Sequence, residues 1–139
     1  VARSALLFQT AEPLEGGRSY LKPPALMGAH QLQRPALPAL LQCFEHIFER
    51  QVQALGRPGD VLVALSTSGG SANVLRAARA ARAGGLVTIA LAGRDGGELA
   101  RICDEAVIVP SPATARVQEA HIFIGHTWCG LIEAHLGMG

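Results

Sequence analysis

The sequence predicts one α/β domain: a three-layer, doubly wound parallel sheet with helices on both faces and a long C-terminal helix. Two observations predict this fold class. From about residue 44 onward, short apolar runs alternate with segments of helical periodicity, which is typical of a parallel sheet covered by helices. The candidate strands are also apolar on both faces, as buried parallel strands are.

The first part of the chain contains a predicted strand, a helix and a second strand. Ala5–Phe8 is a candidate short strand, and we expect the rest of Val1–Pro38, which holds five of the prolines, to be irregular. Phe44–Leu55 carries apolar side chains at helical spacing, which predicts a helix. Val61–Leu65 is a continuous apolar run, short enough to be a buried strand.

The remaining elements repeat the alternation of helix and strand. In order, we expect helix, strand, short helix, strand and long helix at Ala72–Ala83, Leu86–Leu91, Gly96–Ile102, Ala106–Val109 and Thr114–Leu136. Folds of this class bind their ligands at the carboxyl ends of the strands. A functional site is therefore expected in the loops that follow the strands.

Composition and charge exclude several classes of function. The 139 residues are 49% hydrophobic and 17% charged, with a formal net charge of +1, which fits one domain with a sizeable core. The strongly basic face of a nucleic-acid binder is missing, and at 4% aromatic residues there is little for bases to stack on. No segment has the length of a membrane-spanning helix, so neither nucleic acid nor membrane is an expected partner.

Cysteine usage and the first residues indicate the compartment. Cys43, Cys103 and Cys129 lie far apart with no CxxC spacing, which suggests reduced thiols that serve as small core residues. Val1–Thr10 shows no cleavage pattern of a secretory signal. We therefore expect a cytoplasmic protein.

The loop after Val61–Leu65 is the most informative stretch of the sequence. It places Ser66, Thr67, Ser68 and Ser71, together with two glycines, between a strand and a helix. Free N–H groups at a helix start, the positive end of its dipole and close backbone approach make such a loop suited to an anion. The alternative is that Ser71 is an ordinary N-cap. Because no lysine follows and no GxxxxGK[ST] is present, a phosphomonoester fits better than a nucleoside triphosphate.

Several blocks of the sequence, in order, resemble the sugar isomerase (SIS) domain family in its phosphoheptose isomerase branch. The loop STSGGSANVLRA is similar to the family's STSGNSANV, and RQVQALGRPGDVLVALSTSG, LAGRDGGELA and TARVQEAHIFIGHTWCGLIE continue the resemblance. The resemblance implies a flavodoxin-like SIS fold as a single domain over residues 1–139. Residues 44–139 match well, whereas residues 1–43 are diverged or truncated.

The resemblance also implies a function. The family's enzymes isomerise sedoheptulose 7-phosphate to D-glycero-D-manno-heptose 7-phosphate for bacterial surface heptose. They are cytoplasmic homotetramers whose subunits complete one another's sites, so we expect this chain to form a homo-oligomer, a tetramer or a dimer. Ser66, Thr67, Ser68 and Ser71 would bind the substrate phosphate. Gln118 would contact substrate and, with His126, hold a zinc ion. His126 would also serve in proton transfer, for which histidine is suited.

Spacing alone supports the metal pair only weakly. Gln118 and His126 are eight residues apart, about 12 Å along a helix, and a lone helical histidine is more often a packing or interface residue. His121 shares a helical face with Gln118, but we do not assign it as a ligand. Asp95 could contact a sugar or be a turn residue, and Arg116 could attract an anion.

The first part of the chain departs from the family pattern. The family's first glycine loop, of the form CGNGGSAADAQH, and the helix glutamate expected as catalytic base have no match here, and neither does a later Asn-Asp pair that contacts substrate. Three hypotheses stay open: an isomerase, a non-catalytic sugar-phosphate sensor that binds a partner such as a replication initiator, and a structural partner subunit.

Overall fold

Four parallel strands form the centre of the molecule. The computed structural model describes residues 5–9 and 44–137. The strands β1 to β4 are Ala5–Gln9, Val61–Ser66, Val87–Gly93 and Glu105–Val109. They lie side by side in chain order, each parallel to its neighbour, with Ser66 in register with Ala92 at the carboxyl ends of β2 and β3.

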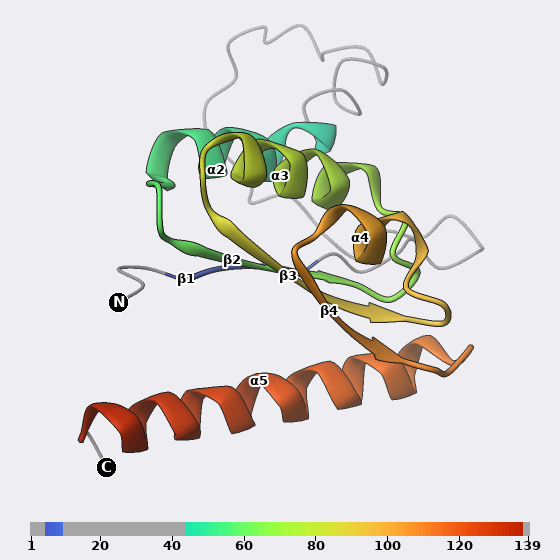
Figure 1. Ribbon diagram of the computed structural model, residues 1–139. Coiled ribbons are helices and arrows are strands. Elements are labelled where there is room, and N and C mark those ends of the chain that lie inside the picture. Colours follow the sequence, from blue (N-terminus) through green and yellow to red (C-terminus); the bar gives the residue numbers. More distant parts are fainter. Residues whose placement is uncertain (1–4, 10–43, 138–139) are drawn as a thin grey trace, which may run out of the picture.

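Helices cover both faces of this sheet. The helices α2 to α5 are Ile47–Leu55, Ala72–Ala83, Gly97–Ile102 and Thr114–Leu136. Figure 1 shows α2, α3 and α4 on one side of the sheet and the long α5 on the other. The predicted three-layer parallel α/β arrangement with a long C-terminal helix is therefore confirmed.

The element boundaries agree closely with the sequence patterns. The bounds predicted for α3 and α5 are identical to those observed, and β2, β3, β4 and α4 differ by at most two residues at either end. The helix predicted from Phe44 is interrupted by a turn at His46, so that α2 proper begins at Ile47. The irregular structure predicted for the rest of Val1–Pro38 lies outside the described residues.

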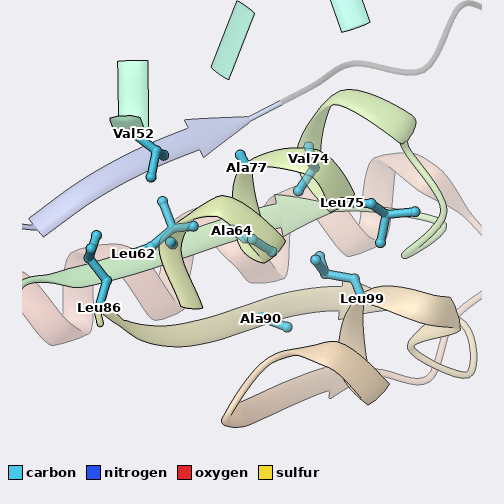
Figure 2. Close-up of a cluster of buried hydrophobic side chains, with 11 residues drawn as sticks. Val52, Leu62, Ala64, Val74, Leu75, Ala77, Leu86, Ala90 and Leu99 are labelled. Atoms are coloured by element: carbon cyan, nitrogen blue, oxygen red, sulfur yellow. The ribbon is translucent and has the colours of Figure 1, made fainter. Parts of the chain in front are cut away.

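The main core lies between the sheet and the layer of α2 and α3. Alternate residues of the strands, Leu62 and Ala64 of β2 and Ala90 of β3, face Val74 and Ala77 of α3 and are almost completely buried (Figure 2). The alanines of α3 let its backbone lie close to the strands, because a methyl side chain takes little space. Apolar burial of this kind supplies most of the stabilisation of the fold.

Three arginines of α3 form ion pairs with residues outside this helix. Arg76 pairs with Glu45, Arg79 with Glu98 of α4, and Arg82 with Asp104 before β4. All six side chains are substantially exposed, and such pairs contribute little to stability one by one. These arginines lie on the solvated face of α3, which is therefore lined with ion pairs.

On the other face of the sheet, α5 is the only described helix (Figure 1), and few of its side chains are buried. Of the 23 residues of α5, only Val117 and His121 are buried. Leu131 and Ile132 of α5 are exposed although they are large and apolar. The expectation that the cysteines are core residues is wrong for Cys129, which is exposed on α5, whereas Cys103 is half-buried. No helix within residues 44–137 is long and apolar enough to cross a membrane.

Candidate functional site

The hydroxyl-rich loop lies where the sequence predicts, at the carboxyl end of β2. The strand ends at Ser66 and α3 begins at Ala72. Ser66 and Thr67 are buried, whereas Ser68 and Ser71 are partly exposed. The loop therefore has an interior half that is built into the protein and an outer half that a ligand can reach.

Ser66 organises the interior half of the loop. Its Oγ lies 2.9 Å from Ser71 Oγ and accepts a hydrogen bond from the backbone N–H of Gly69 at 3.1 Å. Ser71 occupies the N-cap position of α3, but its side chain makes no capping hydrogen bond. Ser71 Oγ is instead held next to Ser66 Oγ, so the simple N-cap interpretation does not describe it. In the first turn of α3 the Val74 N–H donates to Asn73 Oδ1 at 2.9 Å, whereas Ser71 caps none of the first N–H groups. Uncapped N–H groups at a helix start suit the binding of an anion.

A second loop packs directly on the first, glycine against glycine. Gly69 has φ +67, and a Cβ on it would lie 2.1 Å from the carbonyl oxygen of Gly96. A Cβ on Gly97 would lie 2.6 Å from the carbonyl oxygen of Ser68. The backbone N–H of Leu99 also donates a hydrogen bond to the carbonyl oxygen of Gly69 at 2.9 Å. The loops after β2 and β3 therefore touch through their backbones, which only residues without a side chain permit.

The end of β3 joins this pair of loops to α5. A Cβ on Gly93 would lie 2.4 Å from the carbonyl oxygen of Thr67 and 2.8 Å from both Cγ atoms of Val117. Thr67 is 5% exposed, and its Oγ1 has no hydrogen-bond partner among residues 5–9 and 44–137. The side chains of successive residues alternate between the faces of a sheet, so Thr67 is expected to project away from Ser66, toward the α5 layer.

His121 is the second anchor of α5, one turn beyond Val117. Its side chain is 2% exposed, and its Nε2 lacks a hydrogen-bond partner within the part of the chain that the structure describes. Burial lowers the pKa of the imidazole below its ordinary value, and a hydrogen bond with the Ala92 backbone opposes that shift. The neutral ring therefore docks against the last residues of β3. Sequence reasoning did not assign this role, because the periodicity of α5 does not mark which of its turns meets the sheet.

Comparison with known proteins decides the family. A model of the SIS domain matches residues 3–93, which include β1, β2, β3 and the whole hydroxyl-rich loop. The chain belongs to the SIS domain family. The predicted family membership is therefore confirmed, and the match includes the loop after β2.

The most similar proteins include several bacterial phosphoheptose isomerases. The one from Rhodospirillum rubrum is 59% identical over 90 residues, which cover 65% of this chain and 48% of the relative. The one from Nitratidesulfovibrio vulgaris is 49% identical over 120 residues, 76% of this chain and 58% of the relative. The solved phosphoheptose isomerase from Neisseria gonorrhoeae aligns with a TM-score of 0.64 at 47% identity, over 70% of this chain and 59% of that one. This SIS chain thus spans about half the length of these relatives.

The two residues assigned from the resemblance to substrate and metal lie on α5 at different distances from the loop. Gln118 is partly exposed and directly follows Val117, which contacts Gly93. His126 is exposed and lies nine residues beyond Val117, about 14 Å along the helix. The structure therefore brings Gln118 near the carboxyl end of β3 and leaves His126 more than two turns away.

The residues described here do not by themselves form a zinc site. No cluster of three or more His, Cys, Asp or Glu residues with metal-binding geometry occurs within residues 5–9 and 44–137. Protein-bound zinc needs three or four ligands close together, whereas Gln118 and His126 are two turns of α5 apart. A zinc ion at either residue would need ligands from outside the described part of this chain.

Two further candidates have structural roles. Asp95 Oδ1 accepts a hydrogen bond from the backbone N–H of Gly97 at 3.2 Å, as expected of a turn residue ahead of a helix. Arg116 donates to Glu119 Oε2 at 2.6 Å on the exposed side of α5. Both observations favour the structural interpretation of these residues over a direct contact with substrate.

Proposed function

We propose that this SIS chain binds the phosphate group of a sugar phosphate at the loop of residues 66–71 and acts as a phosphoheptose isomerase. The substrate would be sedoheptulose 7-phosphate and the product D-glycero-D-manno-heptose 7-phosphate. The observation that carries the proposal is the loop itself, in which Ser66 orders the backbone and the start of α3 lacks a side-chain cap from Ser71. Ser68 and Ser71 are partly exposed, so their hydroxyls can reach a phosphate.

The chemistry of the reaction sets further requirements. An aldose–ketose isomerisation moves a proton between adjacent carbons, so it needs an acid and a base that work near neutral pH. We propose His126 for proton transfer and Gln118 for contact with substrate. Because His126 lies two turns of α5 beyond the loop, we further propose that it serves the site of a neighbouring subunit. The family's catalytic glutamate has no match in this chain, so a second proton-transfer group would also have to come from elsewhere.

We propose zinc as a cofactor because the resemblance to phosphoheptose isomerases implies it. Bound zinc would polarise the sugar's carbonyl oxygen, with Gln118 and His126 among its ligands. If His126 is a ligand, His126→Ala should abolish zinc bound to the purified protein, measured by elemental analysis. Unchanged metal content in this variant would remove His126 from the ligand set.

A sugar-phosphate sensor is the second candidate function. The distance between His126 and the loop of residues 66–71 favours it. A sensor needs only the loop, whereas an isomerase also needs a proton-transfer group beside it. Such a sensor would bind sedoheptulose 7-phosphate without converting it, and it could pass the signal to a protein partner such as a replication initiator. Turnover by the purified chain distinguishes the two functions, since only the isomerase forms the heptose phosphate.

Calorimetry with sedoheptulose 7-phosphate, with zinc present, tests the phosphate loop directly. We expect heat of binding for the parent chain and a strong loss of affinity when Ser66→Ala is combined with Ser68→Ala. The control is Ser111→Ala, which removes a hydroxyl from the loop before α5, where Ser111 Oγ accepts a hydrogen bond from the Ala113 N–H. No binding by a folded parent chain would overturn the proposal. An equal loss of affinity in Ser111→Ala would show that the effect of the double variant is not specific to the loop of residues 66–71.

We also propose a cytoplasmic homo-oligomer, a tetramer or a dimer, formed through α5. Five large apolar side chains of this helix are exposed, namely Ile122, Phe123, Leu131, Ile132 and Leu136. Exposed apolar side chains in this number on one helix mark contacts between proteins. Sedimentation of the parent chain should show an oligomer that Phe123→Ser with Ile132→Ser dissociates. A monomeric parent chain would contradict this part of the proposal.

A further inference from the structure

The arginines of the chain differ in whether an acidic side chain neutralises them. Arg76, Arg79, Arg82 and Arg116 each pair with a carboxylate. Arg94, which follows β3, is exposed and has no ion pair within residues 5–9 and 44–137. The same is true of Arg50, Arg57 and Arg101, but only Arg94 lies in the loop that touches residues 66–71. Its neighbour Asp95 bonds the Gly97 N–H rather than Arg94.

Contacts on both sides of Arg94 hold it beside the hydroxyl-rich loop. The residue before it, Gly93, lies so close to Thr67 that a Cβ there would be 2.4 Å from the Thr67 carbonyl oxygen. The carbonyl oxygen of Gly96, two residues after Arg94, lies even closer to Gly69, where a Cβ would be 2.1 Å from it. Arg94 is therefore carried on a short strap whose two ends both touch the loop of residues 66–71.

The backbone of Arg94 is strained. With φ +58, it is the one residue other than glycine that has a positive φ among the described residues. This left-handed conformation is unfavourable for a side chain with a Cβ, and strain of this kind persists where the surrounding structure enforces it, often at ligand sites. A glycine would adopt the same backbone without that cost.

The loop itself lacks the charge that its proposed ligand demands. Residues 66–71 contain no lysine or arginine, whereas a phosphomonoester carries nearly two negative charges near neutral pH. Hydroxyls, N–H groups and a helix dipole are partial charges only. Arginine is the side chain best matched to phosphate geometry, because its planar guanidinium can donate two parallel hydrogen bonds.

We propose that Arg94 supplies the full positive charge for the phosphate ester bound at the loop of residues 66–71. The inference rests on the proposed phosphate site and adds to it a residue that binds from the neighbouring loop. The backbone contacts of Gly93 and Gly96 keep Arg94 beside the loop, and the absence of an acidic partner among the described residues leaves the guanidinium available to the ligand.

Binding of sedoheptulose 7-phosphate by the folded variants tests the proposal. Arg94→Gln should weaken binding about tenfold, in line with the loss of a charge-assisted hydrogen bond, and Arg94→Lys should recover part of that loss. Binding by Arg94→Gln should also depend less on salt than binding by the parent chain, because salt screens the lost charge interaction. The matched control is Arg101→Gln, which removes an exposed positive charge from the last turn of α4.

Arg94→Gly separates the binding role from a structural one. Because glycine relieves the strain, we expect its melting temperature to rise by a few degrees while its affinity falls as in Arg94→Gln. A parent chain that binds, with Arg94→Gln and Arg101→Gln of equal affinity, overturns the assignment of Arg94 and leaves the phosphate loop intact. A folded parent chain that binds neither this sugar phosphate nor inorganic phosphate overturns the loop assignment and that of Arg94 together.

Discussion

Gly93 and Val117 meet so closely that a methyl group on Gly93 would lie 2.8 Å from both Cγ atoms of the valine. The same methyl group would lie 2.4 Å from the carbonyl oxygen of Thr67. One small residue at the end of β3 thus lets Val117 of α5 and Thr67 of the hydroxyl-rich loop both approach the same point of the backbone. This contact sets where Gln118, the next residue of α5, stands relative to the loop.

Gly93→Ala should therefore destabilise the protein. Overpacking against both a backbone oxygen and a branched side chain costs about 1–3 kcal/mol, and chemical denaturation measures it. The control is Gly125→Ala in α5, where an added Cβ meets nothing within 4 Å, and where alanine favours the helix by roughly 0.5–1 kcal/mol. Equal stability of Gly93→Ala and the parent chain would mean that α5 is free to move away from β3.

The two glycines of the hydroxyl-rich loop should respond differently to substitution by alanine. Gly69 has φ +67 and faces the Gly96 oxygen, whereas a Cβ on Gly70 would meet only Ser68 Oγ, at 3.7 Å. We expect Gly69→Ala to lower the melting temperature and to abolish sugar-phosphate binding, and Gly70→Ala to keep the fold. If both variants unfold at the temperature of the parent chain, the two loops do not touch as described.

Thr67→Val should separate stability from binding. Thr67 Oγ1 is buried without a hydrogen-bond partner in the described part of the chain, and an unpaired buried hydroxyl costs about 1–3 kcal/mol. Valine has nearly the same shape, so we expect a free energy of unfolding that is unchanged or about 1 kcal/mol higher. If Thr67 turns its hydroxyl to the phosphate, affinity should fall in the same variant. A marked loss of stability would show instead that the hydroxyl is paired in the folded protein.

His121 predicts how stability depends on pH. Burial lowers the pKa of its imidazole in the folded state below the ordinary 6.5, so the unfolded chain binds more protons as the pH falls below that value. Its contribution to stability is therefore complete above about pH 6.5 and decreases as the pH falls toward the folded-state pKa. Denaturation at several pH values should show this slope in the parent chain, and His121→Asn should lack it.

A control on the same helix isolates this effect. His135→Asn changes an exposed histidine in the last turn of α5 and should keep the slope of the parent chain. Asp104 does not interfere, because hydrogen bonds from Thr88 lower the pKa of its carboxyl below the ordinary 3.8. Its contribution is therefore present above that pH and is lost only in stronger acid. Identical slopes in His121→Asn and the parent chain would contradict a buried neutral histidine.

The sequence contained enough information for the elements but not for their contacts. Periodicity and apolar runs predicted α3 to the residue, because local spacing decides which face of a helix is apolar. The cluster of hydroxyls and glycines, which is also a local signal, predicted the loop after β2. Neither signal reveals that Gly69 touches Gly96, because those residues meet only after the crossover through α3 and β3 is complete.

Two residues of the site show the same difference between local pattern and tertiary contact. Ser71 was expected either to bind an anion or to cap α3, and the structure turns its hydroxyl toward Ser66 instead of the helix N–H groups. His121 carries no local mark of burial, since the whole of α5 is rich in apolar residues. Only the meeting of α5 with Ala92 and Gly93 selects Val117 and His121 as the buried turn.

The backbone contact between the loops after β2 and β3 has a consequence for how such a protein can change. Because Gly69 and Gly97 leave room only for each other's backbone, neither loop can be exchanged alone for the loop of a distant relative with side chains there. The two loops must therefore change together in evolution. In protein design, a new specificity would likewise require both loops to be grafted at once. Variation within the family should accordingly concentrate at Gly70, which touches little, rather than at Gly69.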